Sequence, residues 1–281
     1  MFKMSWRCYF YLPSWKPTAN EWMFCNRCIQ SEEKERIRKF VYKKDAIASM
    51  VGRLMLRKLI SEILNLNYGE VGFERSSKER PVLRKDLSVK YPSLDFNLSH
   101  QGDYCVCAAE INNKVGIDVM KISYTGGKSI SEFFNLMKRQ FTSEEWDFIE
   151  LPSLEMEKLE KFYRLWCLKE SYVKAIGVGI SYSLQQLSFC CKSPNLRTDV
   201  VTTDTELYIN NERETNWMFQ ETLLDEQHCV AVAVNKTQKD EDFVPNFKLL
   251  TYRDLIENAE PLSEEDTLCG EEFYGKPERP R

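Results

Sequence analysis

Three segments of the first half of the sequence recur, in the same order, in the second half. The matched segments, each given by its first residue, are SEEKERIRKF (Ser31) with SEEWDFIE (Ser143), GRLML (Gly52) with YRLWCL (Tyr163), and DYCVCAAEI (Asp103) with QHCVAVAVN (Gln227). The offsets are 112, 111 and 124 residues. Chance likeness between two amphipathic helices is common, but three ordered matches at nearly one offset indicate a duplication. The repeat therefore predicts two pseudo-symmetric α+β halves, with the ligand site in a cleft between them.

The expected division follows from the repeat. Residues 1–113 form the N-terminal half, with the linker near Asn112 and Asn113, and residues 114–237 form the C-terminal half. Residues 238–281 carry clusters of Asp and Glu and are predicted to be an acidic tail. The tail also holds apolar residues such as Phe247 and Leu250, so we expect it to be partly ordered.

Local patterns predict the elements of each half. Residues 31–64 read as one helix, because apolar residues recur every fourth position from Ile47 to Ile63. Residues 96–111 read as two strands around a turn at 101–103, and residues 115–121 as a further strand. Residues 162–180 read as a helix that stops at Gly177 and Gly179.

Composition excludes several classes of protein. The 281 residues include 39 Lys and Arg against 43 Asp and Glu, a formal charge of −4, which argues against a general nucleic-acid binder. No apolar run approaches the ~20 residues that a membrane-spanning helix needs, and we find no secretory signal peptide. The sequence therefore predicts a cytosolic protein that does not bind membranes or nucleic acids.

Two charged groups stand out from ordinary core patterning. Asp118 lies inside the apolar stretch VGIDVMK, where a carboxylate is costly to bury, although a lone Asp most often caps a turn. Glu170 and Lys174 lie one helical turn apart, a spacing that also fits a surface ion pair of ~0.3–0.5 kcal/mol. Taken together, Asp118 and Glu170 offer hard oxygen ligands suited to Mg²⁺ beside a substrate phosphate.

Cationic groups gather in the first half. They are Arg36, Arg75, Lys78 and Arg80, with His100 after Ser99 at a strand end. A polyanionic ligand would suit this set, because guanidinium groups bind phosphate through paired hydrogen bonds. Exposed arginines are more often simply solvated, and His100 could instead cap a strand end.

The motifs GIDVM and LWCLKESYVKAIG, preceded by RSSKERPVL and FNLSHQGDY, resemble those of the 4′-phosphopantetheinyl transferases, in their pseudo-dimeric two-halved class. The likeness runs in order from about Glu32 to Val234. It implies an enzyme, a holo-[acyl-carrier-protein] synthase, which moves 4′-phosphopantetheine from coenzyme A to a carrier-protein serine and releases adenosine 3′,5′-bisphosphate. It also implies dependence on Mg²⁺.

The resemblance assigns roles in the second half. Asp118 and Glu170 would hold the metal, and Glu170 would also take the serine proton. Lys174 would contact the pyrophosphate, with Lys169 as a weaker candidate beside it. Many relatives carry Asp-x-Glu where this sequence has Met at 120, so water or the amide of Gln101 is expected to complete the metal site.

The resemblance also assigns the coenzyme A end of the site to the first half. The candidates for the 3′-phosphate and adenine are Arg36, Arg75, Ser76, Ser77, Lys78, Glu79, Arg80, Asn97, Leu98, Ser99 and His100. Among them, the backbone from Asn97 to Ser99 and the His100 side chain would complete the phosphate cradle, and His100 is a further catalytic candidate.

The implied partners are acyl or peptidyl carrier proteins: a fatty-acid synthase domain, a mitochondrial carrier or an aminoadipate-type carrier. Such carriers are typically acidic, so the basic residues Arg84, Lys85, Lys138 and Arg139 are candidate docking groups. Two halves in one chain predict a monomer. Two other functions stay open: a coenzyme A pyrophosphohydrolase that uses water as the nucleophile, and a coenzyme A-binding module without turnover.

Overall fold

The computed structural model describes residues 5–123, 129–179, 182–236 and 244–278. These residues divide into two compact units. Unit 1 comprises Met1–Leu94, Leu98–Cys107 and Phe247–Arg281, and unit 2 comprises Asp95–Asn97 and Ala108–Asn246. The division therefore differs in detail from the expected boundaries at 113 and 237. The segment from Phe247 belongs to unit 1, and a short piece of the first half belongs to unit 2.

A four-stranded sheet has the order β12 (Lys248–Leu250), β1 (Ser5–Tyr11), β5 (Tyr104–Ile111) and β4 (Leu94–Gln101). Most of this sheet belongs to unit 1, whereas residues 95–97 of β4 and 108–111 of β5 belong to unit 2. The strand pair expected at 96–111 is confirmed as β4 and β5, and Gly102 takes a φ of 64° in the turn between them. This left-handed conformation suits glycine, which has no side chain to clash.

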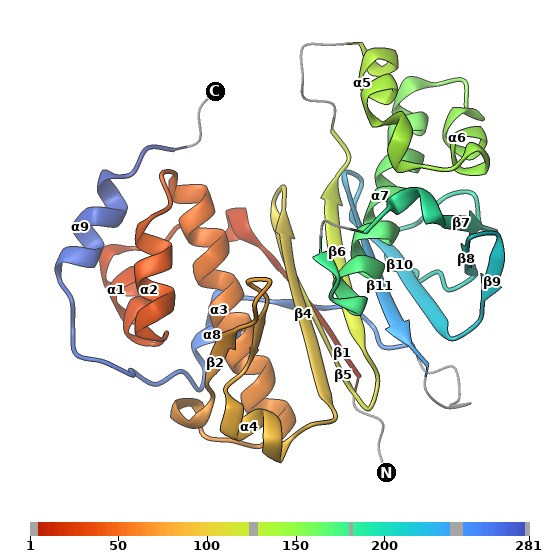
Figure 1. Cartoon of the computed structure of the whole chain (residues 1–281). Coiled ribbons are helices and arrows are strands. Elements are labelled where there is room, and N and C mark those ends of the chain that lie inside the picture. The colour runs from red at the N-terminus through yellow and green to blue at the C-terminus, as the bar shows by residue number, and fades with distance from the viewer. Residues whose placement is uncertain (1–4, 124–128, 180–181, 237–243, 279–281) are drawn as a thin grey trace. The chain divides into compact units, whose positions relative to one another are not determined.

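The helices of unit 1 are α1 (Ala19–Arg27), α2 (Ser31–Arg38), α3 (Lys43–Leu64), α4 (Lys85–Lys90), α8 (Tyr252–Ile256) and α9 (Leu268–Gly275), all labelled in Figure 1. The short hairpin β2 (Phe73–Arg75) and β3 (Pro81–Leu83) carries the basic loop between its strands. Most of α3 is buried, because its apolar residues are spread over more than one face.

The prediction of one helix over 31–64 is wrong, because the structure breaks it between α2 and α3. Distant residues satisfy the backbone at the break. The Lys276 ammonium donates to Arg38 O (2.8 Å) and Phe40 O (2.6 Å), and Lys43 N donates to Pro277 O (3.0 Å). The helix can therefore end without leaving backbone groups unpaired.

Aromatic stacking holds the C-terminal segment in unit 1. The Trp22 and Phe273 ring centroids lie 3.8 Å apart, and those of Trp15 and Tyr252 lie 5.0 Å apart. Each pair joins a residue near the N-terminus to one beyond Phe247. Tyr252 and Phe273 thus attach the acidic segment to the core of unit 1.

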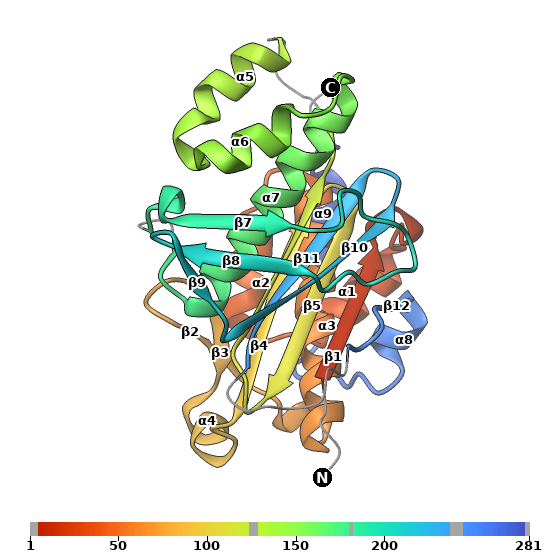
Figure 2. The same cartoon turned by 90° about the vertical axis from the view of Figure 1, so that its right-hand side faces the viewer.

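Unit 2 contains the antiparallel sheet β10 (Trp217–Asp225), β11 (His228–Asn235) and β6 (Val115–Lys121). The long helix α7 (Glu155–Ile176) packs along β6 and β11, and α5 (Ile130–Met137) and α6 (Ser143–Glu150) precede it (Figure 1). A second small sheet is formed by β7 (Leu187–Cys191), β8 (Thr205–Ile209) and β9 (Glu212–Glu214), side by side in Figure 2. As predicted, α7 ends at Gly177, whose φ is 69°.

The two units repeat one plan, and the predicted α+β fold of two related halves is confirmed. The matched segments lie on α2 and α6, on α3 and α7, and on β5 and β11. The paired helices have equal lengths, 8 residues for α2 and α6 and 22 for α3 and α7. The strand order β1-β5-β4 of unit 1 also matches β6-β11-β10 of unit 2.

Within the described residues, no helix has both the length and the apolar character needed to cross a membrane.

Candidate active site

The site in unit 2 depends on an unusually close approach of β6 to α7. A Cβ added to Gly116 would lie 2.0 Å from Ser171 O and 2.5 Å from Ala175 N, which no real Cβ contact allows. Glycine is required at this position because β6 lies directly against the helix backbone. This contact places Asp118 of the strand beside the last turns of α7.

Asp118 and Lys174 form an ion pair. The Lys174 Nζ lies 2.6 Å from Asp118 Oδ1 and 3.4 Å from Ile117 O, which also accepts a hydrogen bond from it. Asp118 is 5% exposed, so the lysine stabilises a carboxylate that would otherwise be costly to bury. The structure therefore brings together two of the three residues that the sequence singled out here.

Glu170 is the third, half-buried and one helical turn before Lys174 on α7. Burial raises the pKa of Glu170, and the negative charge of Asp118 raises it further, whereas Lys174 opposes the shift. A carboxylate with a raised pKa is a stronger base than an exposed one. Glu170 is thus suited to accept a proton, and it lies within the electrostatic reach of Asp118.

The donor set fits Mg²⁺ only with help from a ligand. Within the described part of the chain, no three His, Cys, Asp or Glu side chains are grouped to hold a metal ion. Mg²⁺ commonly uses one or two carboxylates and completes its shell with substrate phosphate and water. Asp118 and Glu170 meet that requirement. The side chain at the third family position, Met120, packs against the hydrophobic core of unit 2.

Lys169, the neighbour of Glu170, has a structural role. It is fully buried, and its ammonium pairs with Glu145 Oε2 (2.7 Å) and donates to Leu184 O (2.8 Å) and Leu187 O (2.6 Å). All three of its protons are therefore engaged inside unit 2. The expectation that Lys169 assists at the pyrophosphate is wrong, because this amine connects α7 to α6, to Leu184 and to the first residue of β7.

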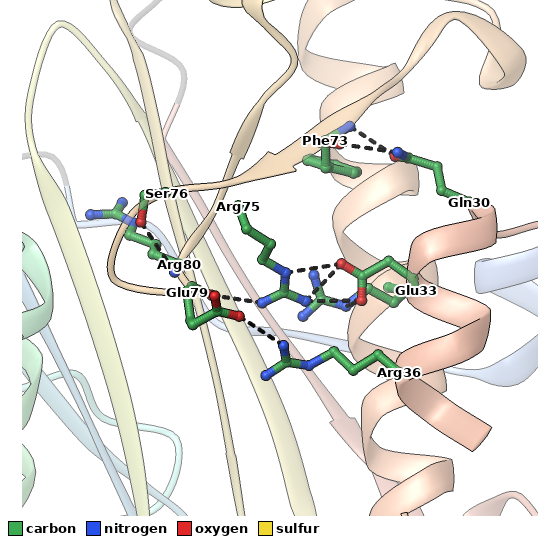
Figure 3. A network of polar contacts seen from close by, with 9 residues as sticks. Gln30, Glu33, Arg36, Phe73, Arg75, Ser76, Glu79 and Arg80 are labelled. Carbon is green, nitrogen blue, oxygen red and sulfur yellow. Dashed lines mark hydrogen bonds and ion pairs between the residues drawn. The ribbon is translucent and has the colours of Figure 1, made fainter. Parts of the chain in front are cut away.

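A second polar group, on the β2–β3 hairpin and the helices beside it, belongs to unit 1 (Figure 3). Arg75 donates to both carboxylate oxygens of Glu33 on α2 (2.7 and 2.9 Å) and to Glu79 O (2.7 Å). Arg53 Nε of α3 lies 3.5 Å from Glu33 Oε2. Burial lowers the pKa of Arg53 to about 10 although Glu33 opposes the shift. Glu33 is therefore the centre of a network that fixes the direction of Arg75.

The loop of this hairpin is held in a defined conformation. Ser76 Oγ accepts hydrogen bonds from Lys78 N (3.3 Å) and Arg80 N (3.2 Å), and Glu79 takes a φ of 61°. The Glu79 carboxylate pairs with Arg36 NH1 at 3.0 Å (Figure 3). The side chains of Ser77 and Lys78 are exposed at the tip. The loop thus presents cationic groups to solvent while its backbone is fixed from within.

The remaining candidates follow one another along β4. Asn97 and Ser99 are buried, whereas His100 and Gln101 are exposed at the end of the strand. The side chain of Leu98 lies against Gly52 of α3, where an added Cβ would come within 2.8 Å of it. His100 and the hairpin residues therefore belong to unit 1, and Asn97 belongs to unit 2.

Sequence reasoning missed the acidic partners of these cations. Glu33 and Glu145 occupy matching third positions of α2 and α6, and each lies beside a buried cation, Arg53 and Lys169 respectively. The matched SEE segments of the repeat are the signal that could have drawn attention to both.

Two models of known protein families match the chain. A family model described as 4′-phosphopantetheinyl transferase, N-terminal, matches residues 13–112, and the model of the 4′-phosphopantetheinyl transferase superfamily matches residues 114–233. The chain belongs to this superfamily. The resemblance seen in the sequence motifs is thereby confirmed, and the protein is an enzyme of the transferase class.

Animal members of the family are similar over almost the whole chain. The L-aminoadipate-semialdehyde dehydrogenase-phosphopantetheinyl transferase of Homo sapiens is 46% identical, over 90% of this chain and 85% of the relative. That of Xenopus laevis is 42% identical, over 95% and 91%. A bacterial relative, the 4′-phosphopantetheinyl transferase Sfp of Bacillus subtilis, is 32% identical over 57% of this chain and 65% of its own.

Proposed function

We propose that this phosphopantetheinyl transferase moves 4′-phosphopantetheine from coenzyme A to a serine of an acyl or peptidyl carrier protein and releases adenosine 3′,5′-bisphosphate. The observation that carries the proposal is the contact of Lys174 with Asp118 (2.6 Å) beside a carboxyl group, Glu170, whose pKa is raised. This combination of a base, a cation and a second carboxylate suits attack on a charged pyrophosphate.

The reaction forms a bond between the serine Oγ and the β-phosphorus and breaks the bond from that phosphorus to the bridging oxygen. The bridging oxygen leaves with adenosine 3′,5′-bisphosphate. Glu170 accepts the serine proton, directly or through a water. Lys174 donates to the pyrophosphate and stabilises the charge that develops on the leaving oxygen.

We propose Mg²⁺ as the cofactor, held by Asp118 and Glu170 with phosphate oxygens and water. When bound, the ion would neutralise the charge of the pyrophosphate. Because the Met120 side chain packs against the core and carries no oxygen ligand, water or the Gln101 amide is proposed for the place that a third carboxylate takes in relatives. Asp118 would bind the ion through its carboxylate once the ligand draws Lys174 toward the phosphate.

The 3′-phosphate and adenine of coenzyme A are proposed to bind the residues of unit 1 that the family motif indicates. Arg75 is the best supported of them, because Glu33 and the Glu79 carbonyl fix its direction. Arg36 and Lys78 add positive charge, and His100 offers a ring nitrogen as a hydrogen-bond donor. The other proposed contacts are Ser76, Ser77, Glu79 and Arg80 on the hairpin and the backbone of Asn97, Leu98 and Ser99.

Carrier proteins are the proposed partners. Lys138 and Arg139 are exposed directly after α5, next to Leu136, which is 65% exposed, and this mixture of charge and apolar surface suits an acidic carrier. Arg84 is a weaker candidate than Lys85, since its guanidinium pairs with Asp86 (2.7 Å). Charge reversal at Lys138 and Arg139 should raise the KM for the carrier. An unchanged KM would remove this docking surface.

The monomeric state and the cytosolic location stay proposals. A light-scattering mass of two chains, or recovery of the native protein in a membrane or organelle fraction, would contradict them.

The test of the reaction is its small-molecule product. Coenzyme A and Mg²⁺ are incubated with the protein, with and without an apo carrier, and the nucleotides are separated. The proposal predicts adenosine 3′,5′-bisphosphate only when the carrier is present. Free phosphopantetheine without a carrier would indicate the pyrophosphohydrolase, and intact coenzyme A in both samples would indicate the binding module.

A further inference from the structure

The outer edge of β6 is held by side chains. One edge of the strand pairs with β11. At the other edge, Val115 N donates to Asp95 Oδ2 (2.9 Å), and Ile117 N donates to Asn97 Oδ1 (3.1 Å). Alternate residues of a strand direct their N–H groups to the same edge, so Asp95 and Asn97, themselves two residues apart, match this spacing. Both belong to unit 2 with β6.

The peptide groups of Ile117 are held on both sides. Its N–H donates to Asn97, which is 5% exposed, and its carbonyl accepts from Lys174 Nζ at 3.4 Å. The next residue is Asp118, whose carboxylate binds the same ammonium at 2.6 Å. The two peptide groups that flank the Cα of Ile117 are therefore held by Asn97 on one and by Lys174 on the other, and Lys174 also binds Asp118.

We propose that Asn97 is a positioning residue for Asp118, with Asp95 in a lesser role, and that its side chain serves the metal and pyrophosphate end of the site. The inference rests on the proposed function. Asn97 then acts through its side chain as well as through its backbone, because the side-chain oxygen accepts a hydrogen bond from Ile117 N inside unit 2. Removal of the acceptor would leave a buried N–H without a partner, and β6 would shift to reach one.

The direction of β6 matters because Asp118 is a short side chain on a strand. A carboxylate one bond from Cβ has little freedom to compensate for a displaced backbone. Groups that orient metal ligands typically change metal affinity by about 10–100-fold when they are removed. Loss of the Asn97 acceptor should therefore lower the affinity for the metal more than it lowers the affinity for the 3′-phosphate.

The test compares Asn97→Leu, which keeps the volume and removes the acceptor, with Asn97→Asp, which keeps an acceptor. Two affinities are measured without turnover. Mn²⁺ binding in the presence of coenzyme A is followed by electron paramagnetic resonance, and binding of adenosine 3′,5′-bisphosphate is followed by calorimetry. We expect Asn97→Leu to weaken Mn²⁺ binding about tenfold or more. Asn97→Asp should weaken Mn²⁺ binding less than Asn97→Leu does, because it keeps an acceptor for Ile117 N. In Asn97→Leu the loss of Mn²⁺ affinity should clearly exceed any loss of nucleotide affinity.

Asp95→Ala serves as the second variant if Asn97→Leu does not fold. Asp95 is only half-buried, so we expect a smaller loss of Mn²⁺ affinity in the same direction. Equal losses for Mn²⁺ and nucleotide, or a loss for the nucleotide alone, would overturn the positioning role. If neither variant changes the Mn²⁺ affinity, the positioning role is also overturned. The proposed function is then unaffected. A wild-type protein that binds coenzyme A but no Mn²⁺ would overturn both.

Discussion

The long helices α3 and α7 carry matching buried cations but different chemistry. At the offset of 111 residues, Arg53 corresponds to Arg164 and Lys58 to Lys169. The two arginines are buried and pair with Glu33 and Glu221, respectively. Both lysines are buried as well. Each unit therefore uses the same positions of its helix to attach that helix to the rest of its fold.

The same alignment separates the helices at the functional positions. Leu59 and Ile63 of α3, both buried, stand where α7 has Glu170 and Lys174. The shared cations attach each helix to its own unit, whereas the residues proposed for the chemistry lie on α7 only. A charged residue in this fold is thus a functional candidate when its counterpart in the other half is apolar.

Lys169→Met should have the largest effect on stability. It leaves Glu145 as a buried carboxylate without its cation, so we expect the free energy of unfolding to fall by about 3–5 kcal/mol. The counterpart Lys58→Met should lower it by about 1 kcal/mol or less, because Glu62 and Glu257 are 45% and 64% exposed. Urea denaturation of both variants measures the contrast. Equal losses would break the distinction drawn between the two lysines.

Lys174→Met should affect activity much more than stability. Loss of a donor that stabilises charge in the transition state lowers the rate by about 10²–10³-fold. Lys158→Met is the matched control, since Lys158 lies on the same helix and pairs with Glu150 at the surface. The rates of carrier modification by Lys174→Met and Lys158→Met are compared at saturating coenzyme A. A Lys174→Met variant as fast as the control would remove Lys174 from the site.

Gly116→Ala should damage both properties. The added methyl would overlap Ser171 O, so β6 and α7 must separate, at a cost of about 1–3 kcal/mol or more. The control is Gly275→Ala, where nothing lies within 4 Å of the added Cβ and the expected change is below about 0.5 kcal/mol. Thermal unfolding and activity are compared for the two. A Gly116→Ala variant with normal activity would show that the close approach is not needed.

Glu170→Gln should give the smallest change, a modest rise in Tm at pH 7 without metal. Because burial and Asp118 raise the pKa of Glu170, its ionisation destabilises the folded state. That destabilisation is complete above the folded-state pKa and disappears as the pH falls below the unfolded value, near 4.3. The Tm difference between variant and wild type should therefore vanish at about pH 4. A Tm that is lower at pH 7 would contradict the raised pKa.

Local patterns were sufficient for much of the fold, whereas the roles of Asp118, Glu170 and Lys174 rest on the family resemblance and stay predictions. The strands at 96–111 and 115–121 and the end of α7 at Gly177 followed from short-range spacing and turn residues. These features depend on neighbours in the sequence, which is why periodicity and turn residues could indicate them.

The features that sequence did not predict depend on distant partners. The break after Arg38 depends on Lys276, and the burial of Lys169 depends on Glu145. The hydrogen bond from Ile117 to Asn97 likewise joins residues of different strands. No local pattern says which charge will meet its partner after folding, so the sequence ranked Lys174 above Lys169 by the family resemblance alone and did not predict that Lys169 is buried.

The central claim is that Glu170, on the functional copy of the repeated helix, takes the proton of a carrier serine. Intact-mass spectrometry of an apo carrier, incubated with coenzyme A, Mg²⁺ and either Glu170→Gln or the exposed control Glu157→Gln, tests it most directly. We expect the Glu157→Gln control to add one phosphopantetheinyl group to the carrier at the wild-type rate. Glu170→Gln should be slower by about 10²–10⁴-fold. Equal rates for the two variants would contradict the account.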